Sequence, residues 1–166
     1  MVAVTSSGTA VVTLPTETQI LITREFDAPK HLVYKAYTTP ELVRRWWTAK
    51  RGEATIAEID LRVGGKWRYV MVTPDGLEVG FHGEYREIVP NERIVSTEVY
   101  EGMPQGTPEE ATLNTVTFAD AGGGTTLTIL MDAPSKGIRD AIIDSGMEAG
   151  LQDAMDLLEE VAASLV

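Results

Sequence analysis

Alternation of apolar and polar residues dominates most of the chain and predicts a series of β-strands. In the segment 66–73, one row holds Trp67, Tyr69 and Met71, while the other row begins with Lys66 and Arg68. A period of two is typical of a strand that has one buried face. The same kind of pattern, with frequent β-branched residues in several segments, predicts seven strands, at 18–26, 54–63, 66–73, 78–88, 93–100, 112–119 and 125–131.

Short turns join several of these strands. The clearest is Pro74-Asp75-Gly76, a strong hairpin signal, and Gly64-Gly65 marks another tight turn. Successive hairpins predict an antiparallel sheet with one solvated face. Before the first strand, residues 1–8 have the pattern of a loose tail, and residues 9–14 are either an edge strand or an arm.

The apolar period changes from two to that of a helix in three places. Asp27, two residues before Pro29, is expected to cap a helix that runs to about Tyr37. Thr39-Pro40 repeats this signal for a second short helix, 41–47. The longest amphipathic stretch, 134–165, predicts one long C-terminal helix, in which Gly146 and Gly150 each cost ~1 kcal/mol relative to Ala and would allow a kink.

This order of elements predicts an α+β fold in which a curved antiparallel sheet wraps the long C-terminal helix. A twisted sheet of this many strands curls, and a curled sheet under one helix encloses more volume than short side chains fill. Methionine and aromatic residues line adaptable apolar sites, although the same residues also build ordinary cores. The candidate cavity residues are Trp46, Trp47, Trp67, Tyr69, Met71, Phe81, Tyr85, Phe118, Met131, Met147, Leu151 and Met155.

Length and composition narrow the classes of protein to consider. The 166 residues fit one domain at 17–166, with 1–16 as a tail or edge arm. There is no cysteine, and the net charge of −11 disfavours binding to nucleic acids or to anionic membranes. No apolar run approaches the ~18 residues of a membrane helix, so we expect a soluble, cytoplasmic protein without membrane insertion.

The residues that usually carry chemistry are sparse. His31 and His82 are expected at the surface, and neither has a second histidine at metal-ligand spacing. No phosphate-binding loop, dinucleotide fingerprint or nucleophile elbow occurs, so the sequence predicts neither a cofactor nor a metal.

Glu98 is the most interesting carboxylate. If it shares the inward face with Ile94 and Ser96, it lies among apolar groups and its pKa rises. The opposite register turns Val95 and Val99 inward and leaves Glu98 in water. The second register is slightly favoured, because its inward residues are more apolar.

Several motifs together resemble one known family. They are the run 22–29, the run 33–42 followed by Trp46-Trp47, the run 64–69, the run 83–95 and the run 145–150. The resemblance is to the activator of heat-shock-protein-90 ATPase homologue family, and it covers roughly residues 17–165. It implies the START-like, helix-grip fold of the SRPBCC superfamily, whose members bind lipids, polyketides and other hydrophobic molecules.

The resemblance also has limits. Family members often carry Trp after the Gly of the long helix, where this chain has Leu151, and the smaller side chain would reshape the floor of a cavity. The eukaryotic activity, stimulation of a chaperone ATPase, belongs to longer proteins with a separate N-terminal domain. We expect no such domain here, so the family name does not give the function.

Three functions are compatible with the sequence. The favoured one is a binding module whose partner is a small hydrophobic molecule. The second is a protein-interaction module that forms a homodimer or binds a chaperone through an apolar patch of Trp46, Trp47 and Met103. The third is a cyclase-type or hydrolase-type enzyme, which needs an ionisable group in the cavity, with Glu98 and the tyrosines as the candidates.

Overall fold

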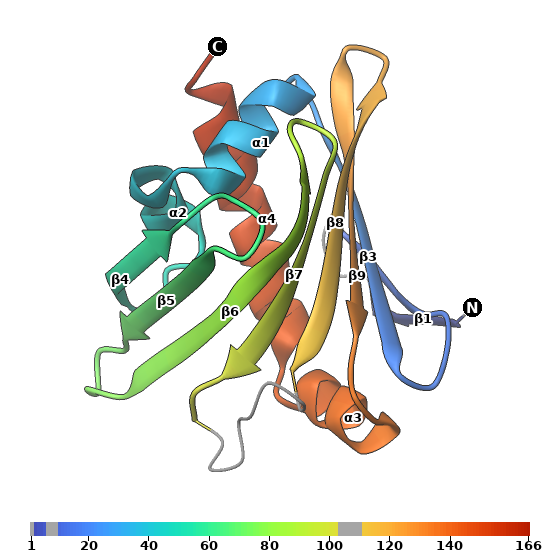
Figure 1. Cartoon of the computed structure of the whole chain (residues 1–166), viewed down its shortest axis with the longest axis vertical. Helices are drawn as coiled ribbons and strands as arrows, with labels where there is room; N and C mark the ends of the chain where they lie inside the picture. The colour runs from blue at the N-terminus through green and yellow to red at the C-terminus, as the bar shows by residue number, and fades with distance from the viewer. Residues whose placement is uncertain (1, 6–9, 103–110) are drawn as a thin grey trace.

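The chain forms an antiparallel sheet that curves around its C-terminal helix (Figure 1). The computed structural model describes residues 2–5, 10–102 and 111–166, with backbone alone for the first of these ranges. The strands are β1 (Val2–Thr5), β2 (Val11–Leu14), β3 (Gln19–Phe26), β4 (Glu53–Ile59), β5 (Lys66–Val72), β6 (Glu78–Val89), β7 (Arg93–Tyr100), β8 (Thr112–Ala121) and β9 (Gly124–Asp132). The helices are α1 (Lys30–Thr38), α2 (Pro40–Trp46), α3 (Lys136–Asp144) and α4 (Met147–Ala163).

The sheet has the strand order β1-β2-β3-β9-β8-β7-β6-β5-β4. Consecutive strands from β4 to β9 pair as hairpins, and β3 closes the series by pairing along its whole length with β9. α4 crosses one face of this sheet, with α1 and α2 packed against it (Figure 1). The helix-grip fold expected from the sequence is therefore confirmed, with the face toward α4 as the concave face.

Most strand positions expected from the sequence are confirmed to within a few residues, and β7 is confirmed at both ends. β4 is shorter than expected, because the chain turns at residues 60–65 with Gly64 at a φ of 83°. The tail expected at residues 1–8 is wrong in part, since β1 pairs with β2 at the sheet edge. The division of the chain into 1–16 and 17–166 stays a prediction.

Two expectations about helices are wrong. The C-terminal helical segment is not continuous, because Gly146 adopts a left-handed φ of 82° and separates α3 from α4. Asp27 does not cap α1, which begins at Lys30 after Pro29 and has no side-chain cap. The main-chain NH of Asp27 instead donates to Glu159 of α4, at 3.1 Å. The Thr39-Pro40 start of α2 is confirmed.

The core lies between the concave face and α4. Inward residues of β3, β8 and β9 pack against the buried stripe of α4, which includes Met155, Leu158 and Val161. Within the described part of the chain, every helix is too short or too polar to span a bilayer. The region near β8 and β9 is tightly closed, with Phe118, Leu127 and Leu158 at most 2 % exposed.

Two polar links fix α4 to the N-terminal strands. Arg24 of β3 is buried and donates to the main-chain oxygen of Met155 at 2.8 Å and to the carboxylates of Asp156 and Glu159. Gln152 of α4 exchanges two hydrogen bonds with the main chain of Ala10, at 3.1 and 2.8 Å. These links hold the helix in register with the sheet.

Candidate functional site

A group of polar side chains faces inward on two neighbouring strands. In β7, Ile94 lies in the core and pairs with Val116 of β8, which lies in the core as well. Side chains alternate between the two faces of a strand. The next inward positions along β7 and β8 from this pair are therefore at every second residue, and these residues are polar. We call them the inner polar patch: Ser96 and Glu98 on β7, with Asn114 and Thr112 opposite them on β8.

The slightly favoured register, with Glu98 in water, is therefore wrong. Glu98 is on the same face as Ile94, and Val99 is buried on the opposite, convex face. The error has a physical cause, since this strand carries buried apolar residues on both faces. An inward Glu98 also meets the requirement that the sequence set for the enzyme alternative.

The position of Glu98 changes its acidity. Burial inside the fold raises the pKa of this carboxyl to about 7, although a hydrogen bond from Asn114 acts in the opposite direction. Asn114 itself has a buried Oδ1 atom that no other group in the described chain contacts as a hydrogen-bond partner. The pair thus combines a carboxyl that titrates near neutral pH with an unused acceptor.

Three inward tyrosines have raised pKa values, and the charge of Glu98 contributes to two of them, Tyr37 and Tyr69. Burial, and then the charge of Glu98, raise the pKa of Tyr37 on α1. Burial also raises the pKa of Tyr69 on β5, with smaller contributions from Tyr85, Tyr37 and Glu98. Burial raises the pKa of Tyr85 on β6. These phenols stay neutral across physiological pH and can only act there as hydrogen-bonding groups.

Aromatic rings form the wall beside the tyrosines. Trp47, which follows α2, packs edge-on against Tyr69 at 5.4 Å and Phe81 at 6.0 Å between ring centroids. Trp67 lies 4.9 Å from Tyr69. Trp67, Tyr69 and Phe81 on β5 and β6 therefore form one aromatic cluster with Trp47, and all four are expected cavity residues.

Apart from Trp46, the remaining expected residues divide into three groups. Met131 of β9, and Met147 and Leu151 of α4, pack at the core but stay partly accessible. Tyr85, Phe118 and Met155 are buried in it. Met71 is outside the core cluster formed by the described residues. The second group is closed to solvent and Met71 lies apart from the core, so only the first group supplies direct candidates for ligand contact.

Trp46 has a structural role that the sequence did not predict. It is 4 % exposed, donates from Nε1 to the main-chain oxygen of Ala36 at 3.0 Å, and packs on Tyr37. It thereby joins α2 to α1. The apolar surface patch expected from Trp46, Trp47 and Met103 is wrong for the two tryptophans, which pack inward, and Met103 lies outside the described residues.

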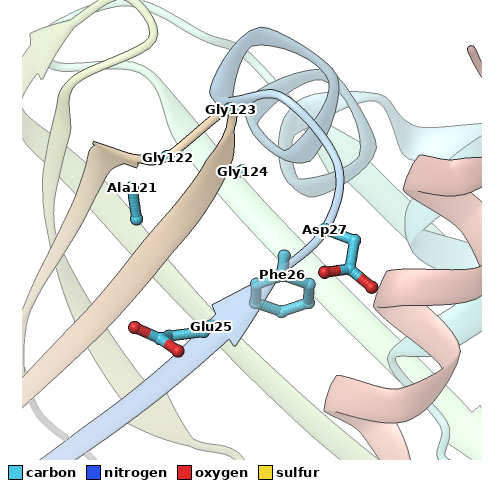
Figure 2. A pocket seen from close by; sticks show the side chains of 7 residues that line it. All are labelled: Glu25, Phe26, Asp27, Ala121, Gly122, Gly123 and Gly124. Carbon is cyan, nitrogen blue, oxygen red and sulfur yellow. The ribbon is translucent and has the colours of Figure 1, made fainter.

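Two pockets are lined by residues other than those of the inner polar patch. One, of about 310 Å³, is lined by Glu25, Phe26, Asp27, Ala121, Gly122, Gly123 and Gly124. Figure 2 shows Glu25 and Asp27 directed to opposite sides with Phe26 between them, so they do not converge on one ligand. The other, of about 470 Å³, is lined by Glu58, Ile59, Asp60, Lys66, Trp67, Arg68, His82 and Gly83.

Polar groups beside the second pocket satisfy one another. Arg68 binds both carboxylate oxygens of Glu101 at 2.9 Å, and His82 Nδ1 lies 2.8 Å from the same carboxylate. The bond from Arg68, more than that from His82, holds the pKa of Glu101 below its usual value. His31 and His82 are exposed, as expected.

A known protein family matches most of this chain. The family described as "Activator of Hsp90 ATPase homolog 1-like protein" matches residues 27–163. The chain belongs to this family. The resemblance seen in the sequence motifs is thereby confirmed, and the fold agrees with the SRPBCC superfamily.

Solved structures of similar proteins share the fold over nearly the whole chain. A protein from Rhodobacter sphaeroides is 25 % identical, with a TM-score of 0.83 and coverage of 92 % of this chain and 97 % of its own. One from Mycobacterium smegmatis is 24 % identical, with a TM-score of 0.80 and coverage of 93 and 98 %. An AHSA1-like protein from Aeromonas hydrophila is 22 % identical, with a TM-score of 0.68 and coverage of 89 and 93 %.

No protein with curated annotation matches the chain. Membership of the family supports a domain that binds a ligand or acts like a co-chaperone, and gives no specific activity. The choice between these roles depends on the site itself.

The sequence contains a signal for the inner polar patch in the alternation along 112–119. Phe118 was expected to line the cavity, and alternation along the strand from it places Val116, Asn114 and Thr112 on the same face. The candidate cavity residues were selected mainly as aromatic residues and methionines, so these polar positions were not among them.

Proposed function

We propose that this chain binds a small, mainly apolar molecule between the concave face of the sheet and α4, next to the inner polar patch. The observation that carries the proposal is a difference in accessibility along the inward face. Phe118, Leu127 and Leu158 are closed to solvent. Inward side chains at the start of α4, and Tyr69 of β5, keep accessible surface. The accessible inward residues are Tyr37, Trp47, Tyr69, Phe81, Glu98, Asn114, Met131, Met147 and Leu151.

This composition suits a small-molecule site. Such sites are mostly apolar and aromatic, with a few polar groups that fix the orientation of the ligand. Here aromatic rings and methionines supply the apolar part, and Glu98 with Asn114 supplies the polar part. Inward residues that stay accessible are what a site needs, because a completely packed interior leaves no room for a guest.

Binding of a neutral fluorescent probe tests the proposal. N-phenyl-1-naphthylamine, whose emission rises in apolar surroundings, is expected to bind the wild-type protein saturably at one site. Leu151→Trp adds volume where the ligand would lie and is expected to abolish this binding. Met147→Phe serves as a second filling variant.

The matched control adds the same ring elsewhere. Leu77 lies in the exposed turn between β5 and β6, so Leu77→Trp is expected to bind the probe like the wild type. Far-ultraviolet circular dichroism checks that each variant is folded. Absence of saturable binding by the wild type, or equal binding by the folded filling variants, would contradict the proposal.

A further inference from the structure

The Glu98–Asn114 pair has a defined pattern of donors and acceptors. The Asn114 amide group donates to the Glu98 carboxyl, which leaves Asn114 Oδ1 buried and without a partner. A buried acceptor without a partner costs free energy, so a group that donates to it is favoured at this position. The pair is the natural place to look for ligand specificity.

Protonation of Glu98 completes the pattern. A carboxylate can only accept hydrogen bonds, whereas a neutral carboxyl also donates one through its O–H group. Because burial disfavours the charged form, the neutral form is accessible at neutral pH. The neutral pair then presents one donor, the Glu98 O–H, beside one acceptor, Asn114 Oδ1.

We infer that the ligand of this site is a neutral molecule with a hydrogen-bond acceptor next to a donor, as in a primary amide or lactam, and that it binds the protonated form of Glu98. The inference rests on the proposed function and names the chemical class of its ligand. The ligand carbonyl accepts from Glu98, and the ligand N–H donates to Asn114. Anionic ligands are disfavoured, because their charge meets an acidic group in a partly desolvated site.

The other titratable groups around the pair do not replace Glu98 in this role. Tyr37 of α1, Tyr69 of β5 and Tyr85 of β6 all have raised pKa values, so they stay neutral between pH 6 and 8. α2 contributes Trp47, which does not titrate.

Glu148 of α4 and Arg139 of α3 have partners of their own. Glu148 of α4 accepts from Gln152 at 3.1 Å. Arg139 of α3 donates to the main-chain oxygen of Thr16 and to Asp140. The pH dependence of binding between pH 6 and 8 should therefore report Glu98.

Four probes with the same naphthalene ring test the inference: 2-naphthamide, 2-acetylnaphthalene, 2-isopropylnaphthalene and 2-naphthoate. Each competes with N-phenyl-1-naphthylamine at pH 6 and pH 8. At pH 6 the amide is expected to bind the wild type about tenfold more tightly than the hydrocarbon, since a satisfied buried hydrogen bond is worth about that factor. The ketone is expected to fall between them, and naphthoate to bind most weakly.

From pH 6 to pH 8, the advantage of the amide is expected to fall about tenfold. With the pKa of Glu98 at about 7, the protonated fraction drops from about nine tenths to about one tenth over this range. Glu98→Gln supplies a permanent N–H donor, so its affinity for the amide is expected to be independent of pH. Glu53→Gln, at an exposed position, is the matched control and is expected to keep the pH dependence of the wild type.

Asn114→Leu is expected to remove the preference for the amide over the ketone while leaving the hydrocarbon bound. The outcomes separate the two proposals. If no probe binds, the proposed function is wrong. If the hydrocarbon binds and the amide binds no better, or the pH dependence survives in Glu98→Gln, the proposed function stands and this inference is overturned.

Discussion

The indole Nε1 of Trp67 on β5 donates a hydrogen bond to the main-chain oxygen of Thr97 on β7, at 3.1 Å, although β6 lies between these strands. The bond can cross β6 because Gly83 of β6 has no side chain at the crossing point. A Cβ atom there would lie 2.7 Å from Nε1 of Trp67 and 1.8 Å from the oxygen of Thr97. This contact holds the indole against β7 at Thr97, the residue before Glu98.

Gly83→Ala is expected to destabilise the fold by about 3 kcal/mol or more, because neither the main-chain oxygen nor the buried indole can move away from the methyl group. Urea denaturation measures the change. Gly137→Ala is the control, since its Cβ meets only the Ser135 hydroxyl at 3.9 Å and Ala suits the interior of α3. Wild-type stability in Gly83→Ala would show that the crossing is not constrained.

Glu98 is expected to make the folded state less stable as the pH rises. Its pKa is 4.5 when unperturbed and about 7 in the fold, so between these values the folded chain holds a proton that the unfolded chain has lost. The free energy of unfolding attributable to Glu98 therefore falls from about pH 4.5 to about pH 7, by up to about 3 kcal/mol, and is constant above.

Glu98→Gln removes this titration. Its free energy of unfolding, relative to the wild type, is expected to rise between pH 5 and pH 8. Urea titrations at several pH values measure the difference, and groups that titrate elsewhere cancel in it. A difference that does not change with pH would mean that Glu98 titrates at its ordinary pKa.

Arg24→Met is expected to cost about 2–3 kcal/mol of folding free energy. The side chain is 4 % exposed, joins β3 to α4 through the Met155 oxygen and two carboxylates, and lies 4.6 Å from the centre of the Phe26 ring. The loss stays below that of a completely buried pair, because the carboxylate of Asp156 can return to water. Chemical denaturation gives the value.

Arg62→Met provides the comparison for Arg24. Arg62 pairs with Asp60 where the two side chains are 70 and 52 % exposed, so its removal is expected to change stability by less than about 0.5 kcal/mol. Equal effects of the two substitutions would show that the link from Arg24 to α4 does not stabilise the fold.

Gln152→Leu is expected to destabilise the chain by about 1–3 kcal/mol and to speed hydrogen exchange at the amide of Ala10. The substitution leaves the main-chain NH and oxygen of Ala10 buried without the partners that Gln152 supplies. Asp153→Asn changes the next residue, which pairs with Arg51 at the surface, and is expected to have little effect. Unchanged exchange at Ala10 in Gln152→Leu would contradict this account.

Local signals predicted most of the elements well. β7 was predicted at both ends, because Pro90-Asn91-Glu92 stops the preceding strand and alternation begins at once. Thr39-Pro40 marked the start of α2 correctly. These signals depend on the φ and ψ preferences of neighbouring residues, which tertiary contacts rarely override.

The candidate site was predicted less completely. Trp47, Tyr69 and Phe81 were expected to line it, and they pack together. Trp46 was expected there too, but it caps α1 through Ala36. Trp46 and Trp47 are adjacent, so the pattern of apolar residues in the sequence does not distinguish their roles. Only the direction of each side chain in the fold shows that Trp47 lines the site and that Trp46 supports the helices.

By itself, the sequence determined the succession of strands and helices, the family and the inward row of aromatic residues, because alternation and turn chemistry act over a few neighbouring positions. Only the tertiary structure decided that Gly146 breaks the C-terminal segment and that Glu98 and Asn114 meet inside the fold. In β7 both faces carry buried residues, so hydrophobicity could not choose the register. The pairing with β8 chose it, and that pairing joins residues distant in the chain.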